Sequence, residues 1–124
     1  MSYQEFKIEL ERRTKQFAIS TFKFSSLLPN ISEANVVRHQ LAKSASSIGA
    51  NYREANRGRS KADFVNKISI CEAESSETCY WIEIIQEMNW VSDEEIEKLL
   101  NEANELLKIF TTIGKKTKAN IEKK

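Results

Sequence analysis

Residues that interrupt helices are scarce in this sequence, because its 124 residues include only three glycines and one proline. The chain is also 30% charged and 40% hydrophobic, which is the balance that amphipathic helices need. The composition therefore favours helices throughout. The length favours one domain covering residues 1–124, since a chain of this size can bury a single core but not two.

Long apolar runs are missing as well. No stretch approaches the roughly 18 apolar residues that a membrane-spanning helix needs, and the N-terminus lacks a basic flank followed by an apolar run. We therefore expect a cytoplasmic protein. Cys71 and Cys79 lie about 12 Å apart along one expected helix, too far to bond to each other. We expect both to be buried thiols in a reducing compartment.

Catalytic groups are few. His39 is the only histidine, so the Glu-x-x-His pairs that build metal sites in helical bundles cannot form. His39 could be half of an acid–base pair, but an exposed or capping position is favoured, and Cys71 is expected in the core, where a thiol is inert. Gly49 and Gly58 do not form a phosphate-binding loop, because no Gly-Lys-Ser/Thr follows. We expect no catalytic residue, metal or cofactor.

Apolar residues recur at helical spacing in four successive segments. The first predicted helix runs from about residue 3 to 28, and it ends there because the residue before Pro29 disfavours the helical conformation. Its apolar stripe consists of Tyr3, Phe6, Leu10, Phe17, Phe24 and Leu27 or Leu28.

The second segment is rich in small residues and contains Gly49. A glycine inside a helix costs about 1 kcal/mol relative to alanine, so Gly49 indicates that another backbone passes close by. Asn30 or Ser32 is expected to cap the start of this helix, and Gly58 to end it in the left-handed conformation. Ser60 and Asp63 resemble a capping box that opens the third helix.

The third and fourth segments complete the pattern. Ser92 and Glu95 have the spacing of a capping box and open the fourth helix. Four long helices with short connections pack most simply as an all-α, up-down-up-down four-helix bundle, with turns near 29–32, 57–60 and 89–92. The stripe of the third helix that faces the core is Phe64, Ile68, Cys71, Ser75, Thr78, Ile82 and Ile85.

The net charge of +1 conceals three charged regions. Residues 38–67 carry seven Lys/Arg and two Asp/Glu, residues 72–105 carry one and eleven, and residues 108–124 carry six and one. In an up-down bundle the two basic regions, the first and the third, meet at one end. Clustered cations of this kind can bind phosphate backbones. The alternative is that these charges only form ordinary solvated faces. The cations of this basic end are Arg53, Arg57, Arg59, Lys61, Lys67, Lys115, Lys116, Lys118, Lys123 and Lys124.

The third helix also carries a second apolar stripe, formed by Ile70, Trp81, Ile84 and Met88. One core does not need two stripes on one helix, and an exposed apolar strip usually marks an interface. We therefore predict a homo-oligomer that uses this stripe. The alternative is that Trp81 and Ile84 pack under the first and fourth helices of the same subunit.

Four ordered segments are similar to one family: Ser47-Ile-Gly-Ala-Asn-Tyr-Arg-Glu-Ala55, Arg59-Ser-Lys-Ala-Asp-Phe64, Lys67-Ile-Ser-Ile70 and Glu77-Thr-Cys-Tyr-Trp-Ile82. They resemble bacterial four-helix-bundle proteins encoded in intervening sequences of 23S rRNA genes. The resemblance implies a ring-like homopentamer without known enzymatic activity. A related branch, the accessory variability proteins of diversity-generating retroelements, is similar in shape and engages nucleic acid and a reverse transcriptase through a basic surface.

Two functions from different classes follow. The first is an oligomeric module that binds RNA or DNA, or a ribonucleoprotein or reverse-transcriptase partner, through the basic end. The second is a structural or protein–protein scaffold whose charges only keep it soluble. Salt-dependent binding to nucleic acid distinguishes them.

Overall fold

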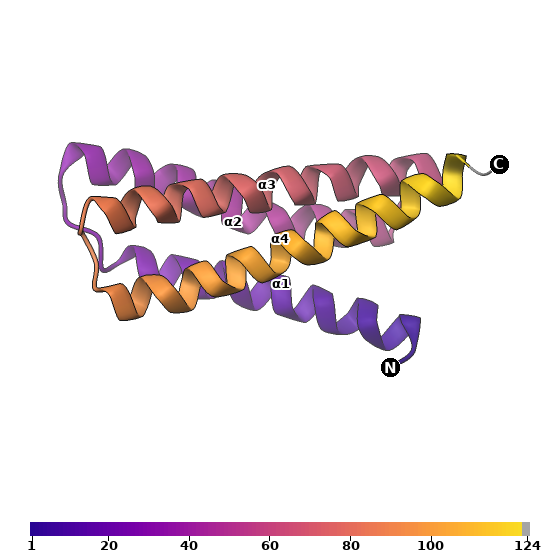
Figure 1. The fold of residues 1–124 in the computed structure, drawn as a ribbon, viewed down its shortest axis with the longest axis horizontal. Coiled ribbons are helices and arrows are strands. Elements are labelled where there is room, and N and C mark those ends of the chain that lie inside the picture. Colours follow the sequence, from indigo (N-terminus) through magenta and orange to yellow (C-terminus); the bar gives the residue numbers. More distant parts are fainter. Residues whose placement is uncertain (123–124) are drawn as a thin grey trace.

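The computed structural model describes the backbone of residues 1–122 and the side chains of residues 1–120. Its four helices are α1 (Tyr3–Ser25), α2 (Ser32–Asn56), α3 (Lys61–Glu87) and α4 (Asp93–Glu122). They run alternately up and down, as Figure 1 shows, and the predicted all-α four-helix bundle is confirmed. None of the helices in the described part of the chain is long and apolar enough to cross a membrane.

The core runs along the inner faces of the helices. The predicted stripe of α3 is buried from Ile68 to Ile85, while Phe64 packs only partly against the core. Cys71 and Cys79 are both buried free thiols, as predicted. The largest fully buried apolar side chains are Leu41, Ile48, Ile68, Ile82, Ile85, Ile96, Leu106 and Phe110.

Gly49 lies where α1 and α2 approach most closely. A Cβ atom at this position would stand 3.0 Å from Thr14 Oγ1 and 3.3 Å from the Thr14 carbonyl carbon. Thr14 is itself fully buried, and its hydroxyl donates to the Leu10 carbonyl oxygen over 2.9 Å. The prediction that a backbone passes close to Gly49 is therefore confirmed.

The α1–α2 connection differs from its prediction. α1 ends at Ser25, three residues early, and the residues before Pro29 form a turn. Pro29 has no N–H group to donate to the Ser25 carbonyl oxygen, so the ladder of backbone bonds cannot continue from this position. The guanidinium of Arg38 on α2 donates to the carbonyl oxygens of Ser25, Leu28 and Pro29 instead, at 3.1, 3.1 and 3.2 Å.

Two predicted caps of α2 were wrong. Ile31 occupies the N-cap position without a side-chain hydrogen bond, and Asn30 instead accepts from the Asn35 amide at 3.4 Å. Gly58 does not adopt a positive φ angle. The turn after α2 closes through backbone bonds from Arg57 and Gly58 to the last carbonyls of the helix, so no left-handed residue is needed there.

The caps around α3 follow the sequence more closely. The Ser60 hydroxyl accepts from the Asp63 backbone N–H at 3.1 Å, which is one of the two bonds of the predicted capping box. At the other end Asn89 has a φ of 56°, the left-handed value that ends many helices. Asn89 and Trp90 donate their N–H groups back to Gln86 and Ile85, and α4 then begins directly after Ser92.

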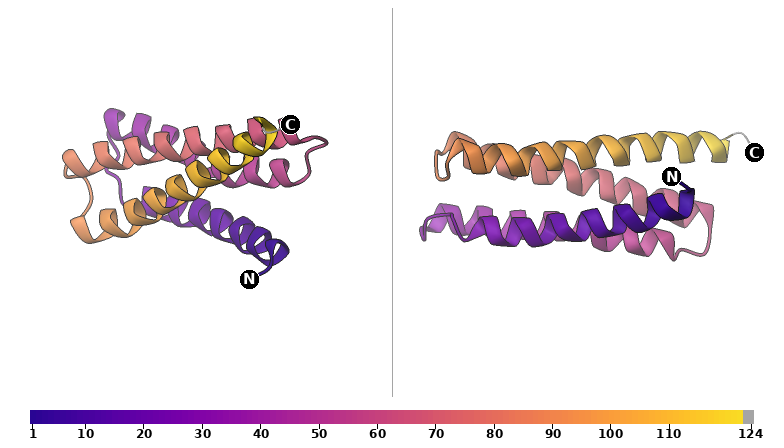
Figure 2. Two further views of the ribbon diagram at one scale, coloured as in Figure 1. Left: turned by 45° about the vertical axis from the view of Figure 1, so that its right-hand side comes forward. Right: turned by 90° about the horizontal axis from the view of Figure 1, so that it is seen from below.

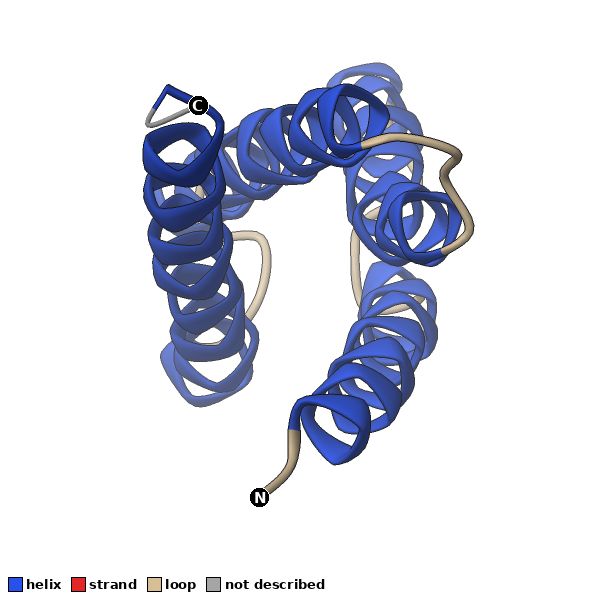
Figure 3. Cartoon of the chain, turned by 90° about the vertical axis from the view of Figure 1, so that its right-hand side faces the viewer, coloured by secondary structure: helices blue, strands red, loops and turns tan. Residues whose placement is uncertain are grey.

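Neighbouring helices around the bundle axis do not all pack on each other to the same extent. α2 packs extensively on α1 and α3, and α3 on α4, whereas α1 and α4 meet over a much shorter length. Figure 2 shows α1 and α4 diverging toward the two chain ends, and the end view in Figure 3 shows the open side between them. The apolar stripe of α1 predicts Tyr3 and Phe6 in the core. Because α4 diverges from this part of α1, the two residues are instead 69% and 37% exposed.

Candidate nucleic-acid interface

The predicted basic cations come from three helices that meet at one end of the molecule. The C-terminus of α2, the start of α3 and the C-terminal part of α4 all lie at the right-hand end of Figure 1. Of the cations described there, only Lys67 is half-buried, and the others are exposed. Lys123 and Lys124 lie outside the described residues. The exposed group is Arg53, Arg57, Arg59, Lys61, Lys115, Lys116 and Lys118.

Acidic neighbours neutralise only a small part of this charge. Arg53 lies 3.7 Å from a Glu11 carboxylate oxygen, and Lys67 lies 3.7 Å from Glu54. Within the described part of the chain, no ion pair involves Arg57, Arg59, Lys115, Lys116 or Lys118. At this end, the described exposed cations without ion pairs outnumber those in pairs. Clustered cations of this kind can attract a polyanion.

The opposite end is acidic, as predicted. It holds the α3–α4 turn, where the seven exposed charged residues include only one lysine. This residue, Lys98, has its ammonium 3.9 Å from a Glu94 carboxylate oxygen. The molecule is therefore a dipole along the bundle axis, and a polyanion is repelled from this end. The exposed carboxylates are Glu83, Glu87, Asp93, Glu94, Glu95 and Glu97.

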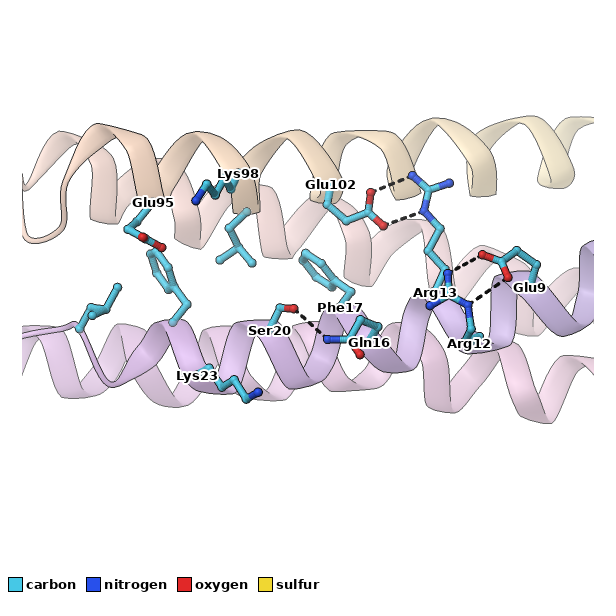
Figure 4. Close-up of a pocket in the computed structure, with 13 residues that line it drawn as sticks. Glu9, Arg12, Arg13, Gln16, Phe17, Ser20, Lys23, Glu95, Lys98 and Glu102 are labelled. Carbon is cyan, nitrogen blue, oxygen red and sulfur yellow. Dashed lines mark hydrogen bonds and ion pairs between the residues drawn. The ribbon is translucent and has the colours of Figure 1, made fainter.

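A groove of about 840 Å³ runs between α1 and α4 on the weakly closed side (Figure 4). The Arg13 guanidinium spans it with two 2.7 Å hydrogen bonds to the Glu102 carboxylate, and Arg12 pairs with Glu9 on α1. The Glu102 carboxylate raises the pKa of Arg13. Because cations and carboxylates alternate along this groove and pair with each other, it lacks the single sign of charge that a phosphate backbone requires.

Nucleophilic and acid–base groups do not converge. The Cys71 thiol donates to the Ile48 carbonyl oxygen at 3.4 Å, and burial raises its pKa to about 12, so the reactive thiolate does not form near neutral pH. His39 is exposed on α2. The described residues contain no group of three His, Cys, Asp or Glu side chains that could hold a metal ion.

The second apolar stripe of α3 lies at the edge of the core. Met88 is 50% exposed and Ile70 is half-buried, and Tyr80, whose ring contacts that of Trp81, is 56% exposed. Trp81 and Ile84 pack partly against the core of their own chain, and the Trp81 indole donates to Glu77 at 3.1 Å. The stripe therefore combines intrachain packing with exposed apolar surface.

Sequence reasoning missed an aromatic cleft that adjoins the basic end. This cleft of about 480 Å³ lies where α1 and α4 diverge, and Tyr52 and Phe64 line it together with Tyr3 and Phe6. The hydroxyl-bearing ring of Tyr52 is 2% exposed and packs edge-on against Phe110 at 5.5 Å. Periodicity places Tyr3, Phe6 and Phe64 on core faces, so only the divergence of the helices reveals the cleft.

The fold and these surfaces define a small all-α bundle with a basic end. The model of the 23S rRNA-intervening sequence proteins matches residues 7–112, and the chain belongs to this family. It is also similar to the solved structure of a protein of unknown function from the S23 ribosomal protein family of Bacteroides thetaiotaomicron. The two share 33% identity and a TM-score of 0.78 over 85% of this chain and 97% of that one. No curated protein matches.

These findings confirm the family resemblance that the sequence motifs predicted. Neither the family description nor that of the solved structure names a reaction, and the latter states that the function is unknown. The relation to accessory variability proteins stays a prediction.

Proposed function

We propose that this protein is a non-enzymatic, oligomeric helical bundle that binds nucleic acid, or a ribonucleoprotein or reverse-transcriptase partner, through its basic end. The observation that carries the proposal is the group of exposed cations without ion pairs in the described part of the chain: Arg57, Arg59, Lys115, Lys116 and Lys118. They come from two chain segments far apart in sequence, and the bundle collects them on one end. Such a surface binds phosphates without reading sequence.

Binding of this kind should depend steeply on salt. Each phosphate contact with duplex DNA contributes about −0.9 to the slope of log K against log salt concentration, so five or six contacts give a slope near −5. Replacing Arg57, Arg59 and Lys118 by glutamine should flatten the slope by about two to three units. Fluorescence anisotropy with one labelled oligonucleotide at several salt concentrations measures both slopes.

The matched control removes three exposed lysines from elsewhere on the molecule. Lys15, Lys23 and Lys43 lie on α1 and α2 outside the basic end, and their replacement by glutamine changes the net charge by the same amount. This control should keep the native slope. An absence of binding at low salt, or an equal effect of both triple variants, would contradict the proposed interface and favour the alternative, a structural or protein–protein scaffold.

The assembly part of the proposal rests on α3. Its second apolar stripe keeps exposed apolar surface at Tyr80 and Met88 beside Ile70, Trp81 and Ile84, and such a strip usually becomes an interface. A heterologous contact closes into a ring when its rotation allows. The family resemblance supplies the number five, so we propose a homopentamer.

Light scattering on the native protein should therefore give a mass well above that of one chain at micromolar concentration. Trp81→Glu/Ile84→Glu should dissociate the assembly, because charges then face each other across an apolar contact. These two side chains also pack on their own core, so Tyr80→Glu/Met88→Glu, with more exposed positions, provides a second variant, and circular dichroism verifies that both remain helical.

Ile19→Glu/Phe22→Glu is the control, since these exposed apolar residues lie on α1. A native monomer would refute the assembly. An oligomer that only the α1 variant dissociates would move the interface to that helix.

A further inference from the structure

We infer that the aromatic cleft at the divergent end binds unpaired bases, so that the ligand of the basic end is single-stranded nucleic acid. The inference rests on the proposed function and specifies its ligand. It starts from two further hollows, of about 220 and 460 Å³, that adjoin the 480 Å³ cleft. Tyr3 and Phe64 line all three, so these two rings stand at the centre of one connected surface.

The charges around this surface have one sign. The linings of the three hollows include Lys7, Arg59, Lys61, Lys108 and Lys116 and no carboxylate. By contrast, Glu9, Glu95 and Glu102 line the α1–α4 groove, and Glu11 and Glu54 line a hollow between α1 and α2. Among these hollows, only those around Tyr3 and Phe64 combine exposed aromatic surface with exclusively positive charge. This combination fits an anionic ligand that carries flat apolar groups.

Single-stranded nucleic acid has this chemistry. Its backbone is held by cations, and its bases stack on aromatic rings regardless of sequence. In a duplex the faces of the bases are already stacked on each other and cannot reach the rings. Tyr3 is suited to stacking because it is 69% exposed, and Phe64 and Tyr52 line the same cleft. The cations of the basic end continue from the cleft, so a strand longer than one nucleotide can be bound.

The test compares probes of one sequence of about 12 nucleotides, within the range that single-strand-binding proteins cover. The probes are single-stranded RNA, single-stranded DNA, the DNA duplex and an abasic strand that retains the phosphates. We expect the native protein to bind either single strand on the order of tenfold more tightly than the duplex or the abasic strand. Tyr3→Ala should lower single-strand affinity about fivefold or more, without changing duplex affinity or the salt slope. Tyr3→Phe should retain the native affinity.

Phe22→Ala is the matched control, because Phe22 is also an exposed aromatic residue of α1, at 51%, but does not line the cleft. The inference is overturned if binding depends on salt but its affinity is the same in Tyr3→Ala, or is the same for single strand, duplex and abasic strand. Either result leaves the proposed function standing. Binding of a free mononucleotide as tightly as the strand overturns it too. If no probe binds at low salt, the proposed function fails and this inference fails with it.

Discussion

Ile68→Asp should unfold the protein. Ile68 is fully buried in the core where α3 packs on α4, and its Cγ2 lies 3.7 Å from where a Cβ of Gly114 would stand. An aspartate there buries a carboxylate without a partner, which costs several kcal/mol, comparable with the whole stability of a small domain, about 5–15 kcal/mol. Far-ultraviolet circular dichroism at 25 °C should show loss of most helical signal.

The control is Ile8→Asp on α1. Ile8 is 62% exposed, so a carboxylate at this position stays hydrated and the chain should remain helical. Equal helicity and equal thermal midpoints for the two variants would show that Ile68 does not occupy the core.

Arg38→Ala should give the second large loss of stability. Its guanidinium bonds to three carbonyl oxygens of the α1–α2 connection, and removing it deprives all three part-buried acceptors of this charged donor, while Ser25 keeps only the bond from the Leu28 N–H. Losing hydrogen bonds from a charged donor costs about 2 kcal/mol, which lowers the thermal midpoint by roughly 6–10 °C in a chain of this length. Differential scanning calorimetry measures the shift.

Arg38→Lys should recover little of this loss, because a single ammonium cannot follow the planar fork that reaches all three carbonyls. Lys43→Ala, an exposed position on the same helix, should leave the midpoint nearly unchanged. An unchanged midpoint in Arg38→Ala would mean that the turn is held by backbone bonds alone.

Local sequence signals determined most of the fold correctly. The periodicity of α3 predicted its buried face, Gly49 indicated the close approach of α1, and Ser60 and Ser92 marked helix starts. One contact that the local signals could not predict joins residues distant in sequence. Arg38 bonds to the Ser25 carbonyl oxygen thirteen positions away, and no rule based on neighbouring residues contains that contact.

The candidate site was predictable only in part. The up-down topology and the charge counts were sufficient to predict that the cations of α2, α3 and α4 lie at one end of the bundle. Periodicity could not show that Tyr3 and Phe6 are exposed, because it assumes that every apolar stripe meets a core. That assumption fails where α1 and α4 diverge, and the rings left there form the cleft.

The short α1–α4 contact also affects how the chain folds. Nearly all packing joins helices that follow each other in sequence, so each helical hairpin can form without waiting for the two ends of the chain to meet, and folding should be fast. The same feature leaves α1 attached mainly through α2. In native-state hydrogen exchange we expect the amides of α1 to open at a lower free energy than those of α3, as a separate unit that frays before the rest of the bundle unfolds.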